Sequence, residues 1–138
     1  MTPHVVVDSS VAFKWLQPAD ERGVNTARQL LAVHRAGGIV LAAPTLLRLE
    51  VANGYWKRGA TADDLAVITG TLEGFGIDWF DISAMLAADA SRIAGEHRLT
   101  VYDASFVALA LLLDAQLVTD DQAVLRSGAC QMRALVEV

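Results

Sequence analysis

The stretch VVVDSSV, residues 5–11, decides the fold, because it joins a short buried strand to a helix through a single acid. Residues 5–7 form a β-branched run typical of a buried strand. Residues 9–16 follow without a helix breaker, and Asp8, Ser9 or Ser10 could cap that helix. The same order, a strand and then a helix, recurs along the rest of the chain.

The remaining apolar segments predict an α/β domain. Further strands are expected at residues 39–42, 77–80, 116–119 and 134–138, and further helices at residues 20–35, 45–58, 61–74, 83–97, 102–113 and 122–126. The strands are short and lack the alternation of a half-exposed antiparallel sheet. We therefore predict a single domain over residues 1–138, with a parallel β-sheet flanked by helices on both faces.

Composition limits where such a chain works and what it binds. The chain is 54% hydrophobic with a net charge of −5, which argues against broad binding of phosphates by lysine and arginine. The apolar content hints at an oligomer or an obligate partner. No apolar run is long enough to cross a bilayer, and the N-terminus does not resemble a signal peptide. Cys130, the single cysteine, can form no internal disulfide, so a cytoplasmic location is expected.

Acids follow two of the expected strands. Asp8 follows the first strand, and Thr119, Asp120 and Asp121 end or follow the fourth. In open α/β sheets, ligands bind beyond the carboxyl ends of the strands, so these side chains are expected at one edge. Each also has an ordinary structural interpretation, since Asp8 could cap a helix and the acid pair could form a turn.

Two more acids lie on helices. Glu50 shares a helix face with Leu46 and Leu47, and Asn53, one turn on, could hold Glu50 or a metal-bound water. Asp103 begins the helix at residues 102–113, where capping alone could explain a carboxylate. That helix is so apolar that its start is expected at the edge of the core.

A cluster of four carboxylates would repel itself unless cations bound to it. Mg²⁺ and Mn²⁺ prefer oxygen ligands of this kind. Such ions lower the pKa of an attacking water and neutralise charge on a phosphate. The acids therefore indicate metal-dependent hydrolysis of phosphodiester bonds.

Four motifs in this order resemble the PIN-domain ribonucleases, and among them the VapC-type toxins of type II toxin–antitoxin pairs. The motifs are VVVDSSV (5–11), LRLEVANGYWK (47–57), LTVYDASFVALA (99–110) and LVTDDQAVL (117–125). The resemblance covers nearly the whole chain. It implies an endoribonuclease that needs Mg²⁺, with Mn²⁺ as a substitute, and that is held inactive by a cognate antitoxin. It also implies a homodimer or a toxin–antitoxin hetero-oligomer.

The resemblance also assigns roles to residues. Asp8, Asp103 and Asp121 match the family's metal ligands, and Glu50 matches the acid that binds metal or positions the water. Ser10 and Thr119 would support the ligands through their hydroxyls, and Asn53 matches the asparagine that follows the helical acid. Asp120 fills the variable position, so which of the adjacent acids is the fourth ligand stays open, with Asp121 favoured.

Two other functions fit the same acids. Asp8 could be the nucleophile of an aspartyl-phosphate phosphatase, although such enzymes usually carry a second acid two residues on, where this chain has Ser10. Alternatively, the acids could capture an arginine of a partner in a non-catalytic binding module, or in an inhibitor of the nuclease. Four nearby cations could contact phosphates, although a solvated charge is the commoner outcome: Lys14, Arg48, Lys57 and Arg58.

Overall fold

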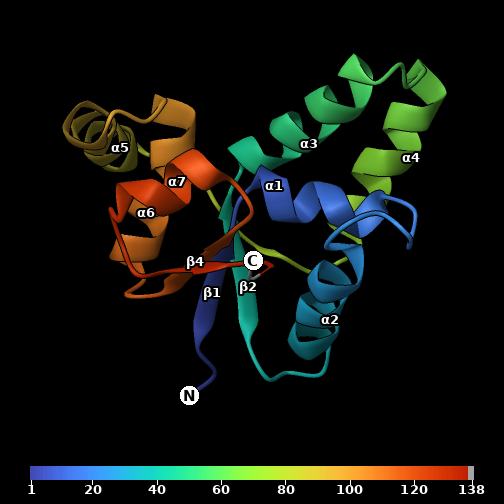
Figure 1. Cartoon of the computed structure of the whole chain (residues 1–138), viewed down its shortest axis with the longest axis horizontal. Coiled ribbons are helices and arrows are strands. Elements are labelled where there is room, and N and C mark those ends of the chain that lie inside the picture. The colour runs from blue at the N-terminus through green and yellow to red at the C-terminus, as the bar shows by residue number, and fades with distance from the viewer. Residues whose placement is uncertain (137–138) are drawn as a thin grey trace.

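The computed structural model describes residues 1–136, which form an α/β domain around one parallel sheet (Figure 1). The strands are β1 (His4–Val7), β2 (Val40–Pro44), β3 (Asp78–Phe80), β4 (Gln116–Thr119) and β5 (Met132–Ala134). Their order is β3-β2-β1-β4-β5, and every neighbouring pair is parallel. The predicted parallel sheet is confirmed, and β1 and β4, whose ends carry acids, are neighbours.

Helices cover both faces of this sheet, as predicted. They are α1 (Ser9–Ala12), the 3₁₀ helix η1 (Phe13–Leu16), α2 (Val24–Arg35), α3 (Leu46–Lys57), α4 (Ala62–Glu73), α5 (Ala84–His97), α6 (Val101–Leu112) and α7 (Gln122–Ser127). In Figure 1, α5 and α6 lie on one side of β1 and β2, and α2 lies on the other. The strands run from the N-terminus towards α1, α3 and α7, so their carboxyl ends meet those three helices.

The apolar helix α6 is central, as its sequence predicts. Every residue from 104 to 110 is buried, and α6 contacts α5, β1, β2 and β4. Thr100 caps the helix by accepting a hydrogen bond from the Asp103 backbone N–H at 3.0 Å. Core packing and this cap together place Asp103 at the edge of the core, in the first turn of α6.

Most predicted boundaries hold within two residues, although the helix expected over residues 9–16 is divided into α1 and η1. Two boundaries are wrong by more. The helix expected from residue 20 begins at Val24, because Gly23 adopts a left-handed φ of 79° that breaks the helical path. The last strand is Met132–Ala134 rather than 134–138, and residues 137–138 lie outside the described part. Pairing with β4 ends where the Leu135 N–H donates to the Thr119 carbonyl. No helix in residues 1–136 combines the length and apolarity needed to cross a membrane.

Candidate active site

Asp8 lies between β1 and α1 and is held by two hydroxyl groups. Ser10 donates from its hydroxyl to Asp8 Oδ1, and Thr119 donates to Asp8 Oδ2. The Ser10 backbone N–H also donates to Oδ1, at 3.1 Å, which makes Asp8 the N-cap of α1. Both carboxylate oxygens therefore act as acceptors, as the ionised form of Asp8 requires.

The two hydroxyls are themselves oriented by the backbone after β4. Ser10 Oγ accepts from the Asp120 N–H at 2.8 Å, and Thr119 Oγ1 accepts from the Asp121 N–H at 3.0 Å. Since each hydroxyl has one hydrogen, accepting from the backbone leaves that hydrogen for Asp8. This network ties the first acid to the loop that carries the fourth.

Burial opposes the charge on Asp8. The side chain is only 4% exposed, and desolvation raises its pKa from 3.8 to about 6. The Ser10 and Thr119 hydrogen bonds lower the pKa, and the negative charge of Asp103 raises it again. Asp8 is thus a carboxylate whose ionised form is held by specific donors against the cost of burial.

Glu50, on α3, is the acid that lacks a hydrogen-bond donor for one of its carboxylate oxygens. Its Oε1 atom is buried and has no hydrogen-bond partner among the described residues. Burial is the largest cause that raises the Glu50 pKa, to about 7, followed by repulsion from Asp103. The Ser9 hydroxyl partly opposes that rise, while Asp8 adds to it. A buried carboxylate oxygen without a donor can be satisfied by a bound ligand, by a water molecule or by a proton.

Asp103 links the other acids electrostatically. Burial raises its pKa first, and the negative charge of Asp121 raises it further. Asp103 in turn raises the pKa of both Asp8 and Glu50. The fold therefore brings together the four acids that the sequence singled out, from β1, α3, α6 and the end of β4.

The two adjacent acids after β4, Asp120 and Asp121, contact different groups. Asp121 caps α7, with its Oδ1 accepting from the N–H groups of Ala123 and Val124 at 2.8 and 3.1 Å. Asp120 pairs with Arg22 at 3.2 Å and with Lys14 at 3.5 Å, so two cations neutralise it. The negative charge of Asp121, and not that of Asp120, is a cause of the raised Asp103 pKa, so Asp121 is the acid of this pair that acts on the group.

Asn53 does not hold Glu50, and the acids are more widely spaced than a set of direct metal ligands would be. Asn53 is exposed and makes no hydrogen bond to Glu50. Within residues 1–136, no three acidic, histidine or cysteine side chains stand close enough to enclose an ion directly. Oxygen donors, mutual repulsion and the orphaned Glu50 Oε1 nevertheless fit a hard cation that keeps part of its water shell, as Mg²⁺ usually does.

Comparison with known protein families matches residues 5–128 to the PIN domain. The chain belongs to the PIN domain family. Comparison with curated protein sequences found no match. The family match spans all four acids, and it confirms the resemblance stated from the sequence motifs.

Solved PIN-fold structures share this architecture at low identity. VapC20 from Mycobacterium tuberculosis, a toxin described as cleaving the sarcin–ricin loop, is 16% identical with a TM-score of 0.74, over 94% of this chain and 98% of that one. A toxin–antitoxin complex from Klebsiella pneumoniae is 19% identical with a TM-score of 0.73, over 97% and 99%. PAE2754 from Pyrobaculum aerophilum is 22% identical with a TM-score of 0.67, over 96% and 92%. At these identities the likeness shows the fold.

Two hollows of this PIN domain adjoin the acids. A groove of about 690 Å³ runs along α3 and includes Glu50 and Asn53, with the exposed rings of Trp56 and Tyr102 beside them. A smaller hollow of about 290 Å³ includes Glu50, Ser9, Ser10 and Arg58. Glu50 therefore lines both hollows, and it is the one of the four acids that does so.

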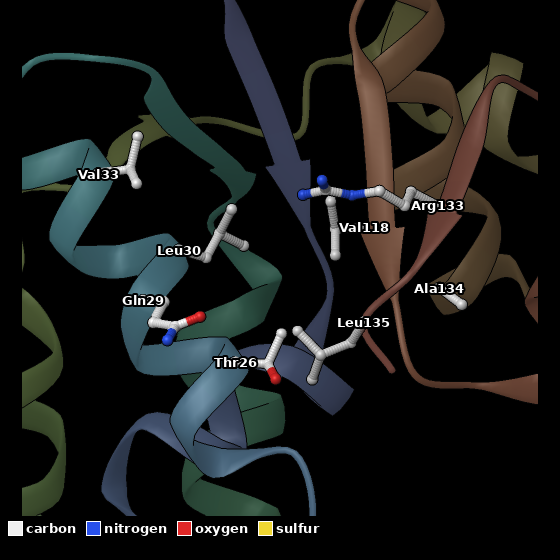
Figure 2. Close-up of a pocket in the computed structure, with 8 residues that line it drawn as sticks. All are labelled: Thr26, Gln29, Leu30, Val33, Val118, Arg133, Ala134 and Leu135. Atoms are coloured by element: carbon white, nitrogen blue, oxygen red, sulfur yellow. The ribbon is translucent and has the colours of Figure 1, made fainter. Parts of the chain in front are cut away.

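A third hollow, of about 340 Å³, lies between α2 and the strands β4 and β5 (Figure 2). The Arg133 side chain extends over Val118 there, opposite Leu30 of α2. None of the four acids lines this hollow, so it is separate from the candidate chemistry.

Some contacts of the site were not identified from the sequence. The sequence offered no reason to pair Asp120 with Lys14 and Arg22, although their opposite charges are visible in it. Ser9 was considered only as a helix cap, yet its hydroxyl acts on Glu50. Both relationships join segments distant in sequence, so only the fold reveals them.

Proposed function

We propose that this PIN domain is a metal-dependent endoribonuclease that hydrolyses RNA phosphodiester bonds. The observation that carries the proposal is the buried, unpartnered Glu50 Oε1 within a group of acids that raise one another's pKa. Burial and mutual repulsion make the charged forms of Asp8, Glu50 and Asp103 less favourable than in water, as their raised pKa values indicate, and a bound divalent cation would offset that cost.

Asp8, Asp103 and Asp121 are the residues that would hold Mg²⁺ or Mn²⁺, and Glu50 would bind it or position the water. The bound ion would lower the pKa of the attacking water and neutralise charge on the phosphate. Ser10 and Thr119 keep Asp8 oriented and ionised through the hydrogen bonds that they donate. Asp121 keeps one oxygen committed to the start of α7, which fixes the direction of its carboxylate.

Glu50 suits the task of accepting a proton from water. Its Oε1 lacks a protein donor among the described residues, so a water can donate to it. A carboxyl group whose pKa is about 7 can exchange a proton near neutral pH. Glu50 lines the groove along α3, so a substrate bound in that groove would lie against this residue.

RNA is proposed as the substrate, and a toxin role as the context, from the likeness to the toxins of known structure. VapC20 is described as cleaving the sarcin–ricin loop, and the Klebsiella structure is a toxin–antitoxin complex. We propose by extension that this chain acts as the toxin of a type II pair. A cytoplasmic location, with an antitoxin present, belongs to the same proposal.

The groove along α3 supports a protein partner. Leu49, Trp56 and Tyr102 are 71%, 61% and 62% exposed, which is a large apolar surface for a small domain. An antitoxin segment that covered these side chains would also cover Glu50, so it would exclude the substrate. A homodimer or a toxin–antitoxin hetero-oligomer would bury such apolar area.

The phosphatase alternative has less support. Such enzymes usually carry a second acid two residues after the nucleophile, and this chain has Ser10 at that position. Ser10, where such enzymes carry a second acid, is occupied in holding Asp8.

The test is cleavage of structured and single-stranded RNA by the chain freed of any antitoxin, with Mg²⁺, Mn²⁺ or EDTA. We expect cleavage with either ion and none with EDTA. Cleavage that persists in EDTA would contradict the proposed metal dependence. A trapped aspartyl-phosphate on Asp8, without RNA cleavage, would replace the nuclease with the phosphatase.

A further inference from the structure

Arg58, at the end of α3, packs over an aromatic pair. Its guanidinium carbon is 4.6 Å from the centre of the Phe13 ring. Phe13 in turn stacks on Tyr55, with ring centres 4.0 Å apart and planes at 21°. The Tyr55 hydroxyl donates to the Phe13 carbonyl at 2.6 Å, which fixes the pair. The guanidinium is thus held by a stack of rings rather than by an acid.

Gly54 makes this stack possible. A Cβ atom at Gly54 would lie 3.0 and 3.1 Å from two carbons of the Phe13 ring, closer than side chains normally pack. The missing side chain lets Phe13 approach α3, and this brings its ring under Arg58. The sequence feature behind the arrangement is therefore a glycine one turn before the arginine.

Arg58 and Glu50 line one hollow, of about 290 Å³, together with Ser9 and Ser10. Three other cations around the site already have acidic partners: Lys14 and Arg22 pair with Asp120, and Arg48 pairs with Glu73 and packs over Trp79. Lys57 lines the separate groove along α3 and does not line the hollow that contains Arg58. Within residues 1–136, Arg58 has no acidic partner within 4.0 Å. An ordered and unpaired cation beside an acidic cluster is suited to an anionic ligand.

We propose that Arg58 binds a backbone phosphate of the RNA chain, next to the bond that is cut. The inference rests on the proposed nuclease function and adds the residue that seats the substrate. A polyanion that approaches a chain of net charge −5 meets repulsion, and a fixed guanidinium at the rim of the acids offsets it. The planar fork of arginine can bind two phosphate oxygens, and stacking reduces the freedom lost on binding.

The test measures binding of a labelled single-stranded RNA of mixed sequence to Asp103→Asn protein, which should hold RNA without consuming it. Arg58→Gln and Arg58→Lys are made in this background, and fluorescence anisotropy is followed over a range of salt concentrations. Arg133→Gln is the matched control, because Arg133 is an exposed arginine over the hollow of Figure 2, which none of the four acids lines. Circular dichroism confirms that each variant is folded.

We expect Arg58→Gln to weaken binding about tenfold at low salt and to reduce the slope of log Kd against log salt by about 0.7. Arg58→Lys should recover the slope and only part of the affinity, because it keeps the charge and loses the fork. Arg133→Gln should bind like the parent. In the active chain, Arg58→Gln should raise KM more than it lowers kcat.

Equal binding by the Arg58→Gln variant and its parent would overturn the proposal for Arg58, while RNA cleavage by the wild type would leave the nuclease intact. A loss of affinity as large in Arg133→Gln as in Arg58→Gln would also overturn it, because binding would then depend on net charge alone. If the wild type neither bound nor cleaved any RNA, the proposed function itself would fail, and with it the role of Arg58.

Discussion

Thr119 donates a hydrogen bond from its hydroxyl to Asp8, although 111 positions separate the two residues in sequence. The bond crosses the neighbouring strands β1 and β4 at their carboxyl ends. Thr119 is fully buried and Asp8 nearly so. A residue at the end of one strand thus orients the first acid of the site, which lies at the end of another.

Replacing Thr119 with valine should affect both stability and pH dependence. The change keeps the shape and leaves a buried carboxylate oxygen without its donor, which should cost about 1–3 kcal/mol of unfolding free energy. Because the lost bond lowered the Asp8 pKa, that pKa should rise, and the pH profile of cleavage should move to higher pH.

Urea unfolding and a pH–rate profile would check this prediction. Thr71→Val is the control, since the Thr71 hydroxyl donates to the Val67 carbonyl on an exposed stretch of α4 and is remote from Asp8. A Thr119→Val profile identical to that of the control would show that the hydroxyl does not tune Asp8.

Mutation should distinguish the roles of the two adjacent acids after β4, Asp120 and Asp121. Asp121→Asn keeps an amide oxygen that can still cap α7, so stability should change little while cleavage falls by about 10²-fold or more. Asp120→Asn removes the partner of Lys14 and Arg22, which should cost about 1 kcal/mol and leave most of the activity. Thermal unfolding and cleavage rates of both variants test this, and the reverse pattern would make Asp120 the fourth acid.

Without metal, the chain should lose stability as the pH rises through the neutral range. The pKa of Glu50 goes from 4.5 to about 7 on folding, and that of Asp8 from 3.8 to about 6, so the folded state binds these protons more tightly. Their stabilising contribution is complete below the unfolded values and is lost as the pH passes about 6 to 7. Stability should therefore be greater near pH 5 than near pH 8.

Unfolding midpoints in EDTA and in Mg²⁺ at both pH values would test this account. Added Mg²⁺ should raise the midpoint near pH 8 and have little effect near pH 5, because a bound cation replaces the missing protons. A midpoint in EDTA that rises steadily from pH 5 to pH 8 would contradict the raised pKa values.

Glu50→Gln should raise the stability of the protein and lower its cleavage activity. The amide carries no charge to bury, so the variant should be more stable than the wild type near pH 8 in EDTA. We expect a gain of about 1–2 kcal/mol, because solvent screening of the partly exposed Glu50 reduces the full cost of its charge. Cleavage should fall by about 10²-fold or more, because an amide cannot accept the proton of a water. Loss of activity together with loss of stability would indicate that Glu50 has a structural role instead.

Hydrophobic pattern was sufficient to predict the sheet and most of the helices. The β-branched run of β1 and the apolar length of α6 can only be buried on both sides, which a parallel sheet under helices provides. The start of α2 was mislocated because residues 20–23 carry no apolar pattern, and the left-handed φ of Gly23 decides the boundary.

The sequence singled out acids that lie near one another in the fold, but it did not predict their contacts. Capping and function had been treated as alternatives for Asp8, yet Asp8 caps α1 and also lies in the acidic group. Contacts such as Ser9 with Glu50 depend on how α1 meets α3, which no local pattern encodes. Arg58 was considered both as a phosphate contact and as a solvated charge, with the second favoured. Its stack on Phe13 joins separate helices, so no local pattern reveals it.

The most direct test of the central claim compares two acids of one segment, Asp103 at the start of α6 and Asp114 just beyond its end. Wild type, Asp103→Asn and Asp114→Asn would be assayed for RNA cleavage in Mg²⁺, with circular dichroism confirming the fold of each. Our account predicts that Asp114→Asn cleaves like the wild type and that Asp103→Asn loses about 10²-fold or more of the rate. Cleavage by Asp103→Asn at the wild-type rate would contradict the assignment of the active site to these acids.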